Sequence, residues 1–143
     1  MTASEAPGPQ LVALCRVDLE LGPVTRVGDG PSGTRVIAEV RAMTLTGDRI
    51  NGTLTGRTSA DWSTIVGGVA TIDVRATIKT DDGATIYVQY RGRTDATHGF
   101  GAAPIYVTPM FETGDERYRW LNNVVAVGKG RLEDRRYDWY EVR

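Results

Sequence analysis

The 143-residue chain contains one cysteine, Cys15, and one histidine, His98. A single cysteine cannot form a disulfide bond within the chain, and zinc sites usually draw several ligands from cysteine and histidine. The glycine cluster GDGPSG is not followed by a helical pattern, so it is predicted to be a turn rather than a phosphate-binding loop. We therefore predict no metal site and no cofactor.

The sequence also lacks an excess of charge and any long apolar run. Its formal net charge is -1, whereas proteins that bind duplex nucleic acid or anionic membranes usually carry a clear basic excess. No apolar stretch approaches the roughly 20 residues of a membrane-spanning helix, and the segment MTASEAPGPQ has neither the basic start nor the apolar centre of a secretion signal. We expect no nucleic-acid partner, no membrane insertion and a cytoplasmic location.

No segment shows a helical hydrophobic pattern over three turns. Instead, short segments rich in β-branched residues alternate polar and apolar positions between glycine-rich turns. Eight strands are predicted, at residues 11–21, 34–45, 49–55, 69–80, 84–92, 104–112, 121–129 and 136–143. One short helical turn is predicted within GDERYRWLNN, with Asp115 and Glu116 near its start.

Strands of this number and spacing predict an all-β fold, specifically a single antiparallel eight-stranded up-and-down barrel. Closure into a barrel removes exposed sheet edges and can leave room for one small ligand. Residues 11–143 are predicted to form this one domain. Residues 1–10 are small, polar and proline-containing, which predicts a disordered N-terminal tail.

The segment IDVRATIKTDDGATIYVQYRG, residues 72–92, predicts a β-hairpin whose turn length can be tested by the composition of its faces. A two-residue loop would mix polar and apolar residues on both faces. A three-residue loop at residues 81–83 places Ile78 opposite Ile86 and Val74 opposite Tyr90, and Gly83 suits the left-handed position that such a loop needs. We therefore predict the three-residue loop.

The other face of this hairpin is polar, and two interpretations of it stay open. In this register Asp73 lies opposite Arg91 and Arg75 opposite Gln89, with Tyr87 on the same face. Antiparallel sheets commonly turn such a face to solvent, where an Asp–Arg pair contributes about 0–1 kcal/mol. Alternatively, the polar face lines the lumen of the barrel and forms a site.

Several segments in order resemble the DUF3237 family, also called UPF0311. They are RVDLELG, GPSGTR, the ADW that contains Asp61 and Trp62, the hairpin 72–92, TPMFETGDERYRWLNN and WYEVR. The resemblance implies a lipocalin-like or calycin-like barrel that often self-associates, and no general activity. Two departures are a short connection, RTDATHGFGAA, where the family has a longer insertion, and Arg41 and Ala42 in place of a glycine pair.

Carboxylates near a phenol or guanidinium in an apolar pocket would support proton transfer without a cofactor, because burial raises the pKa of a carboxylate. Asp61 is expected in a long loop, RTSADWSTIVGG, that folds over a barrel mouth beside Trp62; the alternative is a turn-capping aspartate and an aromatic plug. The candidate catalytic residues are Asp73, Tyr87 and Asp61. The candidate substrate-binding residues are Arg75, Arg91, Trp62, Glu112, Trp120 and Asn122.

Two functions from different classes remain open. The first is a small-molecule-binding barrel that acts as a cofactor-independent isomerase, cyclase or lyase on a small hydrophobic carbonyl or carboxylate metabolite. The second is a non-catalytic binding or structural assembly module whose barrel is filled with side chains. Segments 11–15 and 124–127 are apolar on both faces, and such strands need a covered outer surface. A homodimer is therefore predicted.

Overall fold

A computed structural model describes residues 6–143, so residues 1–5 of the predicted tail lie outside the described residues. Within the described part, nine strands and one 3-10 helix follow one another along the chain. They are β1 (Leu11–Gly30), β2 (Gly33–Thr46), β3 (Gly52–Leu54), β4 (Ala60–Val66), β5 (Val69–Thr80), β6 (Thr85–Asp95), β7 (Ile105–Glu112), η2 (Glu116–Asn123), β8 (Ala126–Arg131) and β9 (Arg136–Val142).

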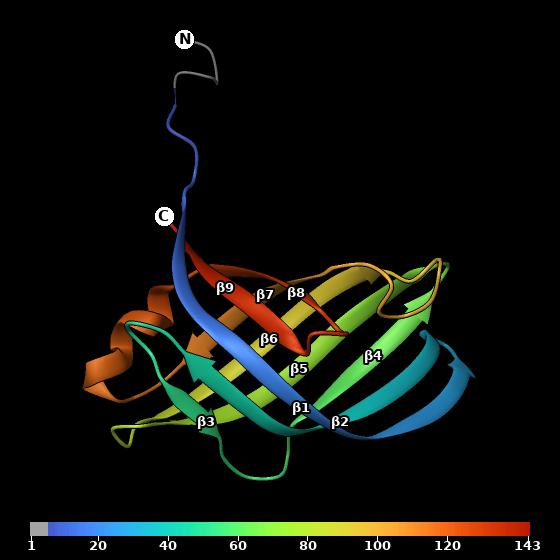
Figure 1. The fold of residues 1–143 in the computed structure, drawn as a ribbon, viewed down its shortest axis with the longest axis horizontal. Helices are drawn as coiled ribbons and strands as arrows, with labels where there is room; N and C mark the ends of the chain where they lie inside the picture. The colour runs from blue at the N-terminus through green and yellow to red at the C-terminus, as the bar shows by residue number, and fades with distance from the viewer. Residues whose placement is uncertain (1–5) are drawn as a thin grey trace.

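The strands form one antiparallel sheet that closes on itself (Figure 1). Strand β1 pairs with β2 along one side and with β9 along the other, which joins the two ends of the sheet. Strands β3 and β4 each pair with both β2 and β5, so together they occupy one position in the ring. The predicted all-β antiparallel barrel is confirmed, but it has nine strands and not the predicted eight, because β3 and β4 are separate strands. Its closer likeness to lipocalins stays a prediction.

Several predicted boundaries differ from the structure, and three of the differences change the assignment of a segment. Residues 60–66, expected in a loop, form β4, because their backbone completes the ladder between β2 and β5. Strand β1 continues to Gly30 instead of ending at residue 21. Residues 121–123 belong to η2 rather than to a strand. The helical turn itself was predicted correctly: the side chain of Asp115 caps it by accepting a hydrogen bond from the backbone N–H of Arg117.

The register predicted for the β5–β6 hairpin is confirmed. Ile78 pairs with Ile86, Val74 with Tyr90 and Asp73 with Arg91. The backbone N–H of Thr80 donates to the carbonyl of Ala84 at 2.8 Å and closes the three-residue loop. Gly83 has a φ of 94°, in the left-handed region that glycine enters at little cost.

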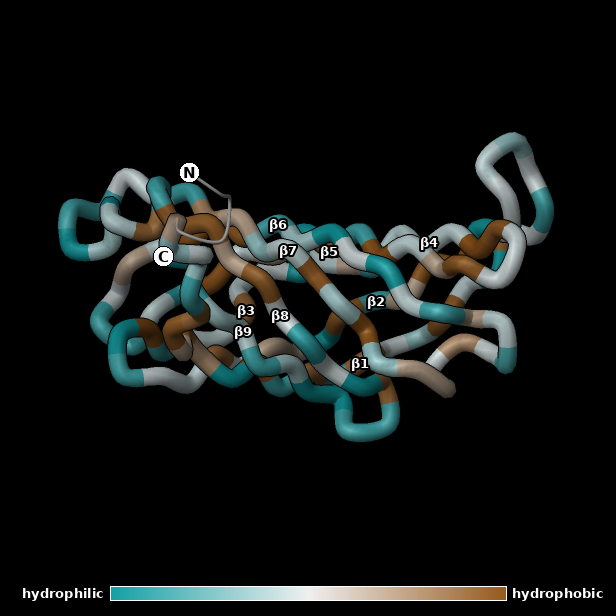
Figure 2. Tube along the Cα trace, turned by 90° about the horizontal axis from the view of Figure 1, so that it is seen from above, coloured by the Kyte–Doolittle hydropathy of each residue, from teal (hydrophilic) through white to brown (hydrophobic). Residues whose placement is uncertain are grey.

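The apolar face of this hairpin lines the lumen, so the interpretation that placed the polar face inside the barrel is wrong. Ile72, Val74, Ile78 and Tyr90 are each at most 2% exposed. Burial of apolar surface dominates folding, and the period of two along a strand then turns the polar set outward. Figure 2 shows apolar and polar positions alternating along the strands.

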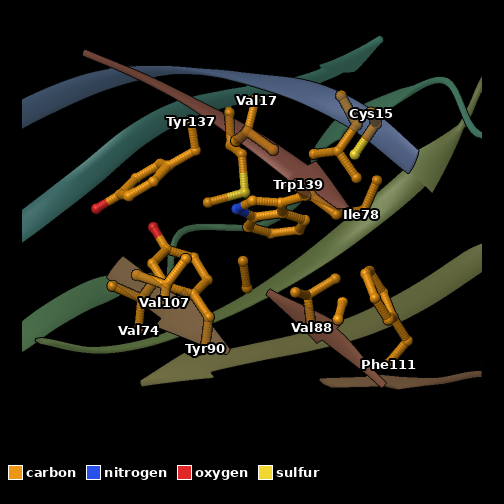
Figure 3. Close-up of a cluster of buried hydrophobic side chains, with 14 of the residues drawn as sticks. Cys15, Val17, Val74, Ile78, Val88, Tyr90, Val107, Phe111, Tyr137 and Trp139 are labelled. Atoms are coloured by element: carbon orange, nitrogen blue, oxygen red, sulfur yellow. The ribbon is translucent and has the colours of Figure 1, made fainter. Parts of the chain in front are cut away.

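The lumen is packed solid at the end near η2. Trp139 fills its centre and contacts the rings of Tyr90 and Phe111 edge-to-face, at centroid distances of 5.4 and 5.9 Å (Figure 3). Cys15 is buried beside this cluster. Burial, with a smaller contribution from Asp138, raises the pKa of the Cys15 thiol to about 12, so the thiol stays protonated and unreactive at neutral pH.

The outer surface keeps several exposed apolar side chains, among them Leu11, Met110 and Val125. They include members of the two segments for which an outer cover was expected, and the homodimer stays a prediction. Within residues 6–143, no helix is long and apolar enough to span a membrane.

Gly128 of β8 makes room for the central tryptophan, which gives a test of the packing. A Cβ added at Gly128 would collide with the Trp139 indole and lie 2.9 Å from Cγ2 of Val107. Gly128→Ala is therefore expected to destabilise the barrel by about 1–3 kcal/mol, the usual effect of overpacking a core. Gly114→Ala is the matched control, because a Cβ there meets nothing within 4 Å. Urea unfolding of both variants measures the difference, and equal stabilities would contradict this account.

Candidate active site in the open half of the barrel

The other half of the lumen holds a cavity of about 320 Å³. It lies at the end formed by the β1–β2 hairpin, the β4–β5 turn and the segment between β6 and β7, opposite η2 (Figure 1). Its volume is within the range of small-molecule sites, which are mostly apolar with a few placed polar groups. The lining residues are Leu19, Leu21, Val24, Arg26, Val36, Ala38, Val40, Asp61, Ser63, Ile65, Ile72, Val74, Tyr90, Phe100, Ile105, Leu132 and Tyr137.

Asp61 is the only carboxylate among these lining residues. It lies on β4, paired with Ala38 of β2 and Val74 of β5, and shares their inward face. One of its carboxylate oxygens accepts a hydrogen bond from the backbone N–H of Asp73 at 3.0 Å. Burial raises the pKa of Asp61 above its usual value, and hydrogen bonds from the Asp73 backbone and the Ser63 side chain offset part of that rise.

Two tyrosines lie close to Asp61 on the cavity wall. Tyr90 of β6 and Tyr137 of β9 contact each other edge-to-face with a centroid distance of 5.7 Å. Their hydroxyl oxygens point to the same side, away from Phe111 (Figure 3). Burial raises the pKa of both phenols, and the charge of Asp61 raises it further. Both hydroxyls are therefore held as neutral hydrogen-bond donors.

This set of groups can carry out acid–base chemistry. A carboxyl group whose pKa is raised by burial can give and take a proton, as general acid–base catalysis requires. Two neutral phenols beside it can donate hydrogen bonds to an oxygen that gains negative charge. The surrounding apolar wall excludes water and strengthens each of these interactions.

Of the residues proposed from the sequence, only Asp61 lines this cavity. It does so from the barrel wall and not from a loop over the mouth. Asp73, Arg75, Tyr87 and Arg91 follow the outward face of the β5–β6 hairpin, because their neighbours at even spacing fill the lumen. Trp62 also points outward from β4 and is 47% exposed.

The register brings Asp73 beside Arg91, yet the two side chains form no ion pair among the described residues. One carboxylate oxygen of Asp73 is instead buried without a hydrogen-bond partner in the described part of the chain. The expected surface salt bridge is therefore not formed, although the backbone register that would permit it is present.

The remaining candidates lie near the packed end of the barrel. Tyr87, Glu112 and Asn122 line one shallow groove on the outer surface. Asn122 exchanges two hydrogen bonds with the backbone of Thr113, at 2.8 and 2.9 Å, and so satisfies a turn. The ring of Trp120 stacks under the guanidinium of Arg49 at 4.8 Å. These contacts join η2 to the barrel and lie outside the cavity.

The sequence interpretation missed Tyr90, Tyr137, Ser63 and Arg26 as cavity residues. A signal existed for Tyr90, because the predicted register already placed it on the apolar face. Tyr137 alternates with Trp139 in RYDWYEVR, which places both on one face of a strand. Arg26 had no such signal, since it depends on a strand irregularity. Among residues 6–143 no group of three or more His, Cys, Asp and Glu side chains is placed to hold a metal ion.

The fold and this site define a class of protein, a closed antiparallel β-barrel with an apolar cavity and an acid–phenol cluster at one end. The family model described as "protein of unknown function (DUF3237)" matches residues 9–142. The chain therefore belongs to the DUF3237 family, and the resemblance found in its sequence is confirmed.

Three comparisons illustrate the range of relatives. The hydroalkoxylation enzyme phnH of Penicillium herquei is 30% identical over 120 residues, which cover 84% of this chain and 73% of that protein. A UPF0311 protein of Bradyrhizobium diazoefficiens is 28% identical over 136 residues, covering 83% of this chain and 86% of the relative. The crystal structure of a β-barrel-like protein from Acinetobacter baumannii superposes with a TM-score of 0.83 at 31% identity, over 96% of this chain and 98% of the other.

The buried acid gives a test based on stability. Because the pKa of Asp61 is raised in the folded state, its contribution to stability is fully present below the unfolded value of about 3.9 and is lost as the pH rises through the folded value. Asp61→Asn removes the buried charge and keeps an acceptor for the Asp73 N–H. The variant is expected to be more stable than the native protein at pH 8. This difference in the free energy of unfolding is expected to shrink toward pH 4.

Urea unfolding at pH 4, 6 and 8 measures this gap in the free energy of unfolding. Asp134→Asn is the matched control, since Asp134 is exposed in the turn between β8 and β9, and little change is expected from it. A stability gap for Asp61→Asn that stayed constant with pH would contradict the account of Asp61 as a buried acid.

Proposed function

We propose that this protein is a cofactor-independent enzyme acting on a small, largely apolar substrate. It adds the O–H bond of a substrate hydroxyl across a carbon–carbon double bond of the same molecule, and so forms a cyclic ether. The observation that carries the proposal is the position of Asp61, a carboxyl group with a raised pKa beside two buried phenols in an otherwise apolar cavity. The relative phnH, a hydroalkoxylation enzyme, supports the choice among cyclase and lyase reactions.

In this reaction Asp61 both supplies the proton and takes one back. The carboxylic acid of Asp61 gives its proton to one alkene carbon, and the substrate oxygen forms a bond to the other carbon. The resulting carboxylate then takes the hydroxyl proton, which restores the acid. No electrons are transferred, and the reverse sequence is an elimination. Asp61 thus acts first as general acid and then as general base.

Tyr90 and Tyr137 orient the substrate. Their neutral hydroxyls donate hydrogen bonds to the substrate oxygens, so that the nucleophilic oxygen faces the double bond. The apolar wall holds the alkene and excludes water, which would otherwise compete with the substrate hydroxyl for the carbocationic centre. The width of the cavity, rather than many polar contacts, selects the substrate.

The test is incubation of the protein in D2O with a phenol that carries an ortho 3-methylbut-2-enyl chain. Cyclisation through Asp61 places one deuterium on carbon in the product, which mass spectrometry detects. Asp61→Asn is expected to reduce the rate by a factor of about 100 or more, the usual contribution of a general acid–base group. Asp134→Asn serves as the control for loss of a carboxylate outside the cavity.

Substitution of a cavity tyrosine is expected to lower the rate less than substitution of Asp61. Tyr137→Phe is expected to slow cyclisation by about two- to tenfold, because one neutral hydrogen bond that orients the substrate contributes about 0.5–1.5 kcal/mol. Tyr106→Phe is the matched control, since Tyr106 is 55% exposed on the outer face of β7.

A phenol that binds without deuterium incorporation would favour the alternative function, a non-catalytic binding module. A rate that Asp61→Asn leaves unchanged would contradict the assignment of the acid. These two results are distinguishable, because binding is measured separately by the quenching of tryptophan fluorescence.

A further inference from the structure

The cavity carries a single cation at its mouth. Arg26 is the only positively charged residue among the lining residues, and Asp61 is the only negatively charged one. Arg26 is exposed, as are its neighbours in the mouth, Val24 and Phe100. Asp61 is half-buried on the wall of the same cavity. The two charges therefore lie at different depths of one cavity.

Arg26 points into the barrel because β1 is irregular. From Val17 to Leu21 the odd-numbered residues of β1 face the lumen, as Val17 at 0% exposure shows. The register then shifts between Leu21 and Val24, at residues 22 and 23, a Gly–Pro pair. After this bulge the even-numbered residues face the cavity.

This shift breaks the usual apolar-inside pattern. It leaves Val27 66% exposed on the outside and places an arginine on the lumenal face. Bulges are frequent at the rims of barrels and next to active sites, where they re-aim a side chain.

The guanidinium of Arg26 has no partner within the described part of the chain. Arg49 bonds to Glu141 at 2.7 Å and Arg117 to Asp115 at 2.9 Å, whereas no ion pair or side-chain hydrogen bond within residues 6–143 involves Arg26. Arg75 and Arg91 on the outer face are likewise unpaired there, and Arg26 differs from them by lining the cavity. A free guanidinium beside an apolar cavity suits planar, bidentate capture of a carboxylate.

The ladder fixes the distance between this cation and the acid. Arg26 pairs with Val36, and Val36 pairs with Ser63, so Arg26 and Ser63 are two strands apart, about 10 Å at the usual strand spacing. Asp61 lies one inward-facing position from Ser63 along β4, about 7 Å further on. Along the curved wall the two α-carbons are therefore about 12 Å apart, and both side chains extend into the space between them.

We propose that the cavity binds small aromatic carboxylates of one or two rings, with the carboxylate on Arg26 at the mouth and the ring end directed toward Asp61, Tyr90 and Tyr137. The ring packs against apolar strand residues and the aromatic side chains of Phe100 and Tyr90. This inference rests on the proposed function only where it names the ring end as the reacting end. The binding of the carboxylate to Arg26 and of the ring inside the cavity does not depend on the proposed function.

The experiment compares 2-naphthoate with its neutral isostere, 2-naphthamide, by tryptophan fluorescence titration and calorimetry. The native protein is expected to bind the carboxylate about tenfold more tightly than the amide, since an Arg–carboxylate pair is charge-assisted and bidentate. Arg26→Gln is expected to abolish this preference without weakening the amide. Arg26→Lys keeps the charge but not the planar fork, and is expected to retain part of the preference.

Arg119→Gln is the matched control. It removes the same charge from an exposed position on η2, at the opposite end of the barrel, and is expected to leave the preference intact. Raising the salt concentration should reduce the preference in the native protein, because the mouth is exposed to solvent and the interaction is screened.

Three results would overturn the inference: no binding of either naphthalene, equal affinity for acid and amide in the native protein, or a preference that survives Arg26→Gln. Circular dichroism verifies that each variant is folded. If Arg26→Gln does not fold, the acid–amide preference of Arg26→Lys tests the inference instead. The deuterium assay for the proposed function uses an uncharged phenol, so its failure is scored separately from naphthoate binding.

Discussion

The double pairing of β1 is the constraint on which the rest of the structure depends. This strand bonds to β2 on one side and to β9 on the other, so it joins the first and last parts of the chain and closes the ring. Strand β1 is long enough for both pairings: residues 11–18 pair with β9, and residues 16–30 pair with β2. Without that closure the sheet would present two open edges and would not enclose the packed core and the cavity.

The lumen is divided by the size of the side chains that enter it. At the η2 end, Trp139 of β9 and Phe111 of β7 contact each other on either side of β8, and Gly128 of β8 leaves room for the indole. At the other end mostly aliphatic side chains, with a few polar and aromatic ones, leave a cavity of about 320 Å³. The packed core and the cavity thereby occupy different halves of one small domain. The pKa of Asp61 is raised because the apolar walls of this half remove much of the water from around its carboxyl group.

Local rules predicted those parts of the structure that depend on neighbouring residues. The β5–β6 register followed from a three-residue turn ending at Gly83 and from the composition of the faces, because a one-residue slip would turn every side chain to the other face. The short helical turn with Asp115 near its start followed in the same way. The position of β4 did not, because its segment RTSADWSTIVGG carries turn signals at both ends, and only long-range pairing with β2 and β5 makes it a strand. The cavity was missed for the same reason: Asp61 and Tyr137 are far apart in the chain, and Arg26 reaches the lumen only through a bulge that shifts the alternation.

The interruption between β3 and β4 has a consequence for how the family can diversify. Residues 55–59 leave the ring between two short strands that share one position, while the backbone N–H of Thr55 still bonds to Thr77 and that of Val40 to the carbonyl of Ser59. The wall is therefore held on both sides of the gap, and the segment between them can change in length or sequence without opening the ladder. Such a segment, set directly before Asp61 in the chain, is a place where changes in length or sequence can alter the shape of the cavity while the ladder of the barrel stays intact.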